Sequence, residues 1–132
     1  MTASNKQIVQ DVFAELAKGN GRPFVDCMAD DFTWTMPGQG TWSGTWRGKK
    51  AVREQLLGPL FARFEGAYTN EAVRIVTEGD IVVVEGRGRV TTKTGKPYNN
   101  NYCFVFRLQD GKLRELTEYM DTELAAQVLG PP

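Results

Sequence analysis

Hydrophobic residues in the first half of the chain recur at the spacing of helices. One set follows the three-and-four spacing of a single helix face: Ile8, Val9, Val12, Phe13 and Leu16. Ser4 and Gln7 form a capping pair before this set, and Gly19 stands where the helix would end. A short helix is predicted over 23–29, with Pro23 in its first turn. A third helix is predicted from residue 49, and Pro59 should kink or break it.

Hydrophobic and polar residues alternate in the second half of the chain, and this alternation predicts strands. The strands are expected over 69–78, 81–93, 98–108 and 112–120, separated by the turn signals Gly79-Asp80, Thr94-Gly95 and Asp110-Gly111. An earlier strand is expected over 32–36. The loop 38–48 that follows is rich in glycine and tryptophan, and it either covers the mouth of a cavity or packs on the third helix. Asp121 should cap a last helix over 122–129.

This order of elements predicts an α+β fold in which a curved antiparallel sheet wraps around N-terminal helices to form a cone-shaped barrel. The length of 132 residues fits a single domain over 1–132. A sheet that curls around helices without closing encloses a conical space, which is either packed solid or becomes a ligand pocket.

The charge composition narrows the possible functions. The chain has 16 Lys+Arg, 16 Asp+Glu and no histidine. Without histidine, Ser-His-Asp and Cys-His nucleophile systems and histidine-ligated zinc sites are excluded. The zero net charge argues against nucleic acid or an anionic membrane as a partner. We therefore expect a small hydrophobic ligand or a second subunit, no cofactor and no metal, with any proton transfer left to a carboxylate, a phenol or water.

The cysteines and the first residues bear on the cellular compartment. Cys27 and Cys103 lie in apolar stretches, which favours two buried thiols in a reducing compartment. Residues 1–6 contain no apolar secretory segment, and no run approaches the roughly 18 apolar residues of a membrane span. These features predict a cytoplasmic protein.

Six short strings spread over the chain carry a family resemblance. They are Ala29-Asp30-Asp31, Trp46-Arg47-Gly48, Gly95-Lys96-Pro97-Tyr98-Asn99, Val105-Phe106, Asp110-Gly111-Lys112 and Glu118-Tyr119-Met120-Asp121. They resemble the nuclear transport factor 2-like (NTF2-like, or cystatin-like) superfamily of α+β barrels, above all its SnoaL-like, ketosteroid isomerase-related branch. Polyketide cyclases and limonene epoxide hydrolase also belong to this superfamily. The resemblance implies a homodimer that buries the outer face of the sheet, around Cys103, Val105 and either Val83 or Val84.

The last predicted strand places one carboxylate in apolar surroundings. Leu116, Glu118 and Met120 share its more apolar face. If this face is buried, the pKa of Glu118 should rise, and the side chain could act as an acid or base near neutral pH. A surface ion pair for Glu118 is one alternative. A one-residue register change, which would turn Asp121 inward, is another. In the resemblance to limonene epoxide hydrolase, Glu118 falls where that enzyme carries a catalytic aspartate.

Other candidate ligand-binding residues lie on the neighbouring strand and on the first strand. Asn100, Tyr102 and Phe104 share an aromatic face, on which the amide and the phenol could donate hydrogen bonds to a substrate carbonyl or position a water. Trp34 and Met36 should face the same cavity, where Trp34 would supply a flat wall and an indole donor. For Tyr102 and Trp34, packing in the core is the alternative.

Two placements remain open for the strand 81–93. Simple alternation puts Glu85 and Arg87 on its outer, charged face. The resemblance to limonene epoxide hydrolase instead brings both side chains near cavity positions, where that enzyme has an Arg and an Asp. A bulge at Gly86 or Gly88 would permit either placement.

Together these features predict a cofactor-independent acid/base enzyme of the isomerase, cyclase, dehydratase or hydrolase type, acting on a small hydrophobic carbonyl-bearing or cyclic compound. The candidate catalytic residues are Glu118, Glu85 and Arg87. The candidate substrate-binding residues are Trp34, Met36, Asn100, Tyr102, Phe104, Leu116 and Met120. The ketosteroid isomerase mechanism is not expected, because Met36, Val12 and Phe104 stand at the positions of its functional groups. The alternative is a non-catalytic small-molecule-binding or dimerisation module of the same fold.

Overall fold

The helices and strands follow the predicted order, with one additional strand. The computed structural model describes residues 4–132. The elements in chain order are helices α1 (Asn5–Leu16) and α2 (Arg22–Cys27), strands β1 (Met28–Met36) and β2 (Gly44–Arg47), a helical segment made of α3 (Lys49–Ala51), the π-helical turn η1 (Val52–Leu57) and α4 (Gly58–Phe61), strands β3 (Phe64–Glu78), β4 (Ile81–Thr92), β5 (Asn101–Gln109) and β6 (Lys112–Met120), and helix α5 (Thr122–Leu129).

The six strands form one sheet in the order β2-β1-β6-β5-β4-β3, with β2 and β3 at its open edges. This confirms the predicted α+β fold with a curved sheet that does not close. The antiparallel meander from β3 to β6 is also as predicted. The prediction is wrong at one pair, because β1 runs parallel to β6. Parallel neighbours need a long crossover, and the helical segment and the meander together provide one.

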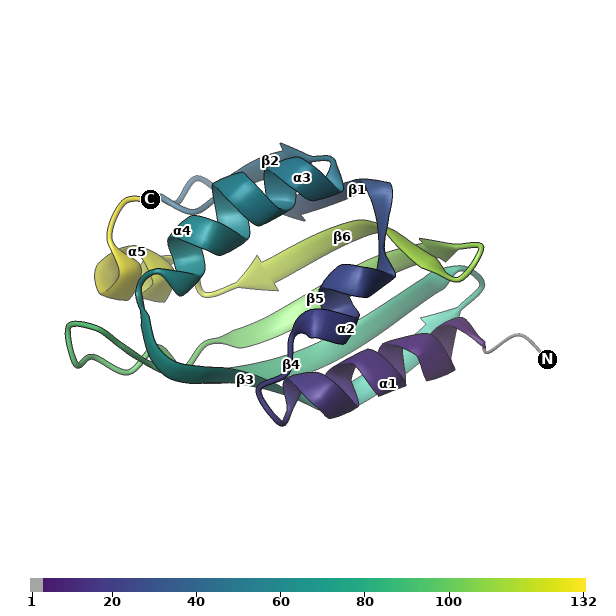
Figure 1. The fold of residues 1–132 in the computed structure, drawn as a ribbon, viewed down its shortest axis with the longest axis horizontal. Helices are drawn as coiled ribbons and strands as arrows, with labels where there is room; N and C mark the ends of the chain where they lie inside the picture. Colours follow the sequence, from purple (N-terminus) through teal and green to yellow (C-terminus); the bar gives the residue numbers. More distant parts are fainter. Residues whose placement is uncertain (1–3) are drawn as a thin grey trace.

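The helices cover one side of the sheet in two groups (Figure 1). Helix α1 packs on β3 and β4, while the helical segment over 49–61 packs on β1 and β2. The buried residues of α1 are Val9, Val12, Phe13 and Leu16, the face that the spacing predicts. The middle strands β5 and β6 therefore face the space between the two helical groups.

Ser4 and Asp121 cap α1 and α5 as predicted, although the Gln7 side chain, expected to complete a capping box, donates to Asp11 instead. The backbone N–H of Gln7 donates to Ser4 Oγ at 3.1 Å, and the N–H of Leu124 donates to Asp121 Oδ1 at 3.0 Å. The Asp121 side chain caps the start of α5. The alternative register of the last strand, in which this side chain would point into the cavity, is therefore wrong.

Several predicted boundaries change in the structure. The loop 38–48 contains the edge strand β2, which pairs antiparallel with β1. The second helix ends at Cys27, because Met28 and Ala29 already belong to β1. Strand β3 begins at Phe64, earlier than predicted, and β5 begins at Asn101, later than predicted.

Pro59 does not interrupt the third helix. The helix instead widens into the π-helical turn η1, in which the N–H of Gly58 bonds to the carbonyl of Arg53 five residues earlier. Proline has no N–H to donate and crowds the preceding turn, and the wider turn accommodates both effects. The helical segment consequently continues without a break over 49–61 and covers one side of the cavity.

Cys27 and Cys103 are free thiols and are half-buried, not fully buried as predicted. Of the residues 1–6 that were expected to lack a secretory segment, 1–3 lie outside the described residues. Across 4–132, no helix combines the length and the apolar character that a membrane span requires.

Candidate functional site

A pocket of about 830 Å³ lies between the sheet and the two helical groups, a volume within the usual range of small-molecule sites. Most of its wall is aromatic or aliphatic. Phe24 comes from α2, Leu57 and Phe61 come from the helical segment, and Phe104 and Phe106 come from β5. Phe24 packs edge-on against Phe106, with ring centroids 6.2 Å apart. The space enclosed by the sheet is therefore an apolar pocket and not a solid core.

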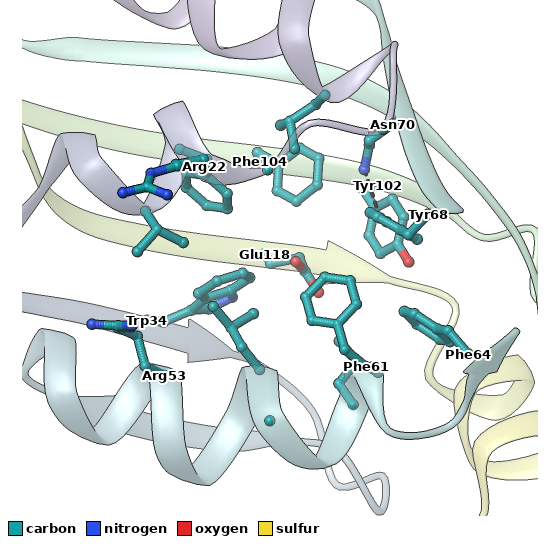
Figure 2. A pocket seen from close by; sticks show the side chains of 18 of the residues that line it. Arg22, Trp34, Arg53, Phe61, Phe64, Tyr68, Asn70, Tyr102, Phe104 and Glu118 are labelled. Carbon is teal, nitrogen blue, oxygen red and sulfur yellow. Dashed lines mark hydrogen bonds between the residues drawn. The ribbon is translucent and has the colours of Figure 1, made fainter. Parts of the chain in front are cut away.

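Glu118 is the one acidic side chain of this pocket that is buried, with 5% of its surface exposed. Strand β6 directs it inward, opposite Phe104 on β5 (Figure 2). Within residues 4–132 its carboxyl group has no hydrogen-bond or ion-pair partner. Desolvation raises the pKa of Glu118 from its ordinary value of 4.5 to about 8. Both the protonated and the ionised form are thus accessible near neutral pH.

A polar cluster occupies the end of the pocket beyond Glu118 (Figure 2). It consists of the phenols of Tyr68, Tyr98 and Tyr102 and the amide of Asn70, whose Nδ2 donates to the Tyr68 hydroxyl at 2.9 Å. Burial raises the pKa of all three tyrosines, and their interactions with Glu118 add to this. The phenols therefore stay protonated near neutral pH and can donate hydrogen bonds.

Two glycines on the inner face of β4 make room for this cluster. A Cβ atom at Gly88 would lie 2.8 Å from both the Tyr68 hydroxyl and the Tyr102 ring. A Cβ atom at Gly86 would lie 2.6 Å from Asn70 Oδ1. Larger residues at these positions would displace the polar side chains, so the two glycines allow these side chains to pack closely against β4.

Trp34 contributes a further polar group, its indole N–H, to the wall. Its side chain is 4% exposed, and among residues 4–132 its indole N–H has no acceptor. An unpaired buried donor costs about 1–3 kcal/mol, which a ligand oxygen would offset. The ring packs against Phe24 with centroids 5.6 Å apart, so it also forms the flat wall expected from the sequence.

Among the other candidate residues, Met36, Tyr102, Phe104 and Met120 line the same pocket as Glu118 and Trp34. Leu116 is buried on the inner face of β6 but is not among the lining residues. Trp42, from the loop that was expected to cover the cavity or pack on the third helix, is buried in the pocket wall. Its indole N–H donates to the Gly130 carbonyl at 2.7 Å.

The prediction that Asn100 presents its amide to the cavity is wrong. The amide donates to the Tyr98 hydroxyl at 3.0 Å and to the Asp121 carbonyl at 3.1 Å, and it accepts from the N–H groups of Asn101 and Asp121. With both polar atoms engaged, Asn100 ties the end of β6 to the segment before β5, and it does not line the pocket.

The structure also corrects the placement of Glu85 and Arg87 in the cavity. Both side chains lie on the exposed face of β4, and Glu85 pairs with Arg74 at 3.1 Å. The bulge considered at Gly86 or Gly88 does not occur, and the irregularity beside these residues is in the neighbouring strand, where Val73 is an extra residue of β3. Strand β4 therefore alternates regularly, and its charged face points outward.

Sequence reasoning missed Tyr68 and Asn70, which share the inner face of β3, and the basic residues Arg22, Lys49 and Arg53 at the edge of the pocket. The sequence did contain a signal for Tyr68 and Asn70. Both stand an even number of residues after Phe64, the first residue of β3, so they belong to the same face of that strand. Within 4–132, no three His, Cys, Asp or Glu side chains come together as metal ligands would.

A curved sheet with an apolar pocket on its helix-covered side defines a class of small-molecule-binding α+β domains. The chain belongs to the SnoaL-like domain family, whose model matches residues 9–116, and the predicted resemblance is confirmed. No curated protein matches the chain.

Solved structures extend this similarity over nearly the whole chain. An NTF2-like protein from Burkholderia thailandensis E264 is 26% identical, with a TM-score of 0.81 over 98% of this chain and 100% of that one. A candidate SnoaL-like polyketide cyclase from Jannaschia sp. CCS1 is 18% identical, with a TM-score of 0.76 over 100% and 99% of the two chains. TerC, crystallised with polyporic acid, is 21% identical, with a TM-score of 0.76 over 95% and 97%. The last two similarities concern the fold.

Proposed function

We propose that this protein is a cofactor-independent enzyme that moves a proton on a small hydrophobic carbonyl-bearing or cyclic compound, with Glu118 as the acid or base. The observation that carries the proposal is a desolvated carboxyl group with a pKa of about 8 in the wall of an apolar pocket. A general acid or base works best when its pKa lies near the working pH, and burial alone brings Glu118 there.

As a base, ionised Glu118 takes a proton from the carbon next to the substrate carbonyl. The C–H bond breaks, its electron pair moves to the carbonyl oxygen, and Glu118 holds the proton. Near pH 7 about one molecule in ten carries the ionised form. Return of the proton to another carbon isomerises the substrate. Attack of the enolate on a second carbonyl instead closes a ring, and the alkoxide that forms takes the proton back from Glu118.

The phenols of Tyr68 and Tyr102 support the same step. They line the pocket beyond Glu118 and stay protonated near neutral pH, because burial raises the pKa of both. Hydrogen bonds from such donors stabilise the negative charge that develops on a carbonyl oxygen. The indole N–H of Trp34, which has no acceptor in residues 4–132, is a third donor for a substrate oxygen.

The names of two similar structures agree with this substrate class. One is a candidate polyketide cyclase, and the other, TerC, was crystallised with polyporic acid. Both share the fold of this chain, and our extension of a cyclic or carbonyl-bearing ligand to this protein rests on its own apolar pocket.

The test is deuterium exchange next to a carbonyl group. The protein is incubated in deuterated water with a panel of bicyclic and aryl ketones, and deuterium incorporation is followed by mass spectrometry. Wild-type protein should accelerate exchange of at least one ketone, and Glu118→Gln should remove at least about 99% of the acceleration. Glu71→Gln, which changes an exposed carboxylate of β3, should leave it intact.

Ketones that bind without accelerated exchange, or exchange that survives Glu118→Gln, would contradict the enzymatic proposal. The first outcome would favour the alternative of a binding module without turnover.

We also propose that the protein is a homodimer joined through the outer face of the sheet and that it acts in the cytoplasm. The outer side chains Val83, Val105 and Thr117 lie in one row across β4, β5 and β6, next to Cys103 and the 51% exposed Tyr119. Such a broad, partly apolar face suits a twofold mate. The two free thiols suit a reducing compartment.

A further inference from the structure

The rim of the pocket carries a positive charge that the acid/base proposal does not use. By rim we mean the part of the pocket wall that carries charged residues on α2 and on the helical segment over 49–61. Arg22 and Asp26 stand on the α2 side, and Lys49 and Arg53 stand on the other side. Figure 2 shows Arg22 and Arg53 at the same end of the pocket, with Glu118 between them and the tyrosines.

These cations are only weakly neutralised. Arg22 is 3.8 Å from Asp26, but both side chains are largely exposed, and exposed pairs of this kind contribute little. Lys49 and Arg53 also line a second, neighbouring pocket together with Asp30 and Glu54. Within 4–132, however, neither of them has a carboxylate within ion-pair distance. The rim therefore presents three cationic groups, of which two are unpaired in the described chain.

The interior of the pocket, unlike its rim, disfavours an anionic group. Around Glu118 the wall is apolar apart from the neutral polar cluster, and it holds no basic side chain. An anionic group placed there would therefore lose its hydration without gaining a counter-charge. It would also repel ionised Glu118. A ligand that carries both an apolar body and an acidic group can satisfy both regions in only one orientation.

We infer that the ligand of this pocket is a hydrophobic organic anion, whose apolar body fills the pocket and whose acidic group stays at the rim with Arg22, Lys49 and Arg53. This inference rests on the proposed function in so far as it names the substrate class of the same site. It also fixes the orientation, because the end of the ligand opposite the acidic group reaches Glu118 and the tyrosines.

Two fluorescent dyes of nearly the same shape test the inference. Anilinonaphthalene sulfonate (ANS) is anionic, and phenylnaphthylamine is the same ring system without the sulfonate. At about 20 mM salt, the wild-type protein should bind ANS at least about fivefold more tightly, and phenylnaphthylamine should displace ANS. At about 500 mM salt this preference should shrink, because the rim is exposed and is screened.

Charge variants of the rim separate this effect from binding elsewhere. Arg53→Glu and Arg22→Glu should each weaken ANS binding about three- to tenfold and leave phenylnaphthylamine within about twofold. Asp26→Asn should change ANS binding in the opposite direction. Lys96→Glu makes the same charge change at an exposed position in the β4–β5 turn, outside the pocket, and should leave the ratio of the two affinities unaltered.

Equal affinities for the two dyes, ANS that phenylnaphthylamine does not displace, or a preference that survives both Arg variants would overturn the inference. The readout does not depend on turnover. Glu118→Gln should keep the ANS preference while losing exchange activity, so failure of the rim and failure of the acid/base proposal give different results.

Discussion

At the scale of single residues, the decisive property of Glu118 is its isolation. Its raised pKa has one cause, desolvation, since no cation or hydrogen-bond donor of residues 4–132 contacts it. Two-residue alternation along β6 was sufficient to predict that it faces inward with Leu116. Its apolar surroundings come from Phe24, Phe61 and Phe104, which lie far apart in the sequence.

The raised pKa of Glu118 predicts a pH-dependent stability. The native state keeps the Glu118 proton up to about pH 8, whereas the unfolded chain releases it near 4.5. Between these values the native state binds more protons, so the free energy of unfolding falls as the pH rises and levels off above about 8. Glu118→Gln has no carboxyl group to ionise, so its free energy of unfolding should not fall in this way as the pH rises. The variant should match the wild type near pH 5 and exceed it near pH 9 by at most roughly 5 kcal/mol.

Urea unfolding at both pH values, followed by tryptophan fluorescence, measures this difference. The exposed-site control Glu71→Gln should follow the wild type at both pH values. An unchanged pH dependence in Glu118→Gln would show that the carboxyl group is solvated.

Gly88, which lies against Tyr68 and Tyr102, gives a second prediction at this scale. In Gly88→Ala the new Cβ atom would lie 2.8 Å from the Tyr68 hydroxyl and the Tyr102 ring, so both tyrosines must move. Overpacking of this kind costs about 1–3 kcal/mol, and it should also reduce ketone exchange. Gly21→Ala, whose Cβ atom would make an ordinary contact at 3.9 Å, should cost less than about 1 kcal/mol. Urea unfolding and the exchange assay measure both effects, and a fully active, stable Gly88→Ala would contradict the packing described here.

At the scale of elements, one side chain links three parts of the chain that border the pocket. Arg63, between α4 and β3, donates to the carbonyls of Pro59, Leu129 and Pro131. Its guanidinium group also lies 5.0 Å from the centre of the Trp42 ring. Because Trp42 and Leu129 line the pocket, Arg63 connects helix α5 to the pocket wall.

Arg63→Ala should therefore loosen α5. Loss of the charged hydrogen bonds and the ring contact should lower the free energy of unfolding by about 2 kcal/mol, and amide hydrogen exchange should rise over 122–129. Arg63→Lys keeps the charge but not the planar fork of donors, and it should recover only part of the loss. Exchange over 122–129 that stays at the wild-type rate in Arg63→Ala would contradict this role.

The elements also show how far the sequence could predict this structure. Helix α1, its cap and the hairpin turns follow from local patterns, and all were predicted. Strand β2 and the parallel pairing of β1 with β6 depend on contacts between distant segments, which periodicity does not report. Simple alternation along β4 gave the outward placement of Glu85 and Arg87, and the inward placement, which came from the resemblance and needed a bulge in β4, was wrong. Asn100 was predicted on the correct face of the sheet. Its hydrogen bonds to Asp121, 21 residues away, could not be predicted from the local sequence pattern.

At the scale of the whole molecule, the two faces of the sheet serve different purposes. The inner face holds the pocket, whereas the outer face carries Val83, Val105 and the half-exposed Tyr119. Val105 lies between Val83 and Thr117 in the sheet register, at the centre of the surface that we propose for dimerisation.

The dimer proposal predicts a mass twice the chain mass of 14.7 kDa in size-exclusion chromatography with light scattering. Val105→Asp places a charge at the centre of the interface and should give a folded monomer, since an unpaired charge buried between subunits is costly. Gln10→Asp places the same charge on the exposed side of α1, away from the outer face of the sheet, and should remain dimeric. A wild-type monomer at micromolar concentration would contradict the proposal.

The ionisation of Glu118 underlies the proposed chemistry, and it can be measured directly. In a carbon-13 NMR titration of the glutamate carboxyl carbons, the Glu118 signal is assigned by its absence in Glu118→Gln. We predict that this signal titrates with a pKa of about 8. A Glu118 signal that titrates near the ordinary value of 4.5 would contradict the account, because the pocket would then hold a solvated carboxylate with no role as an acid or base at neutral pH.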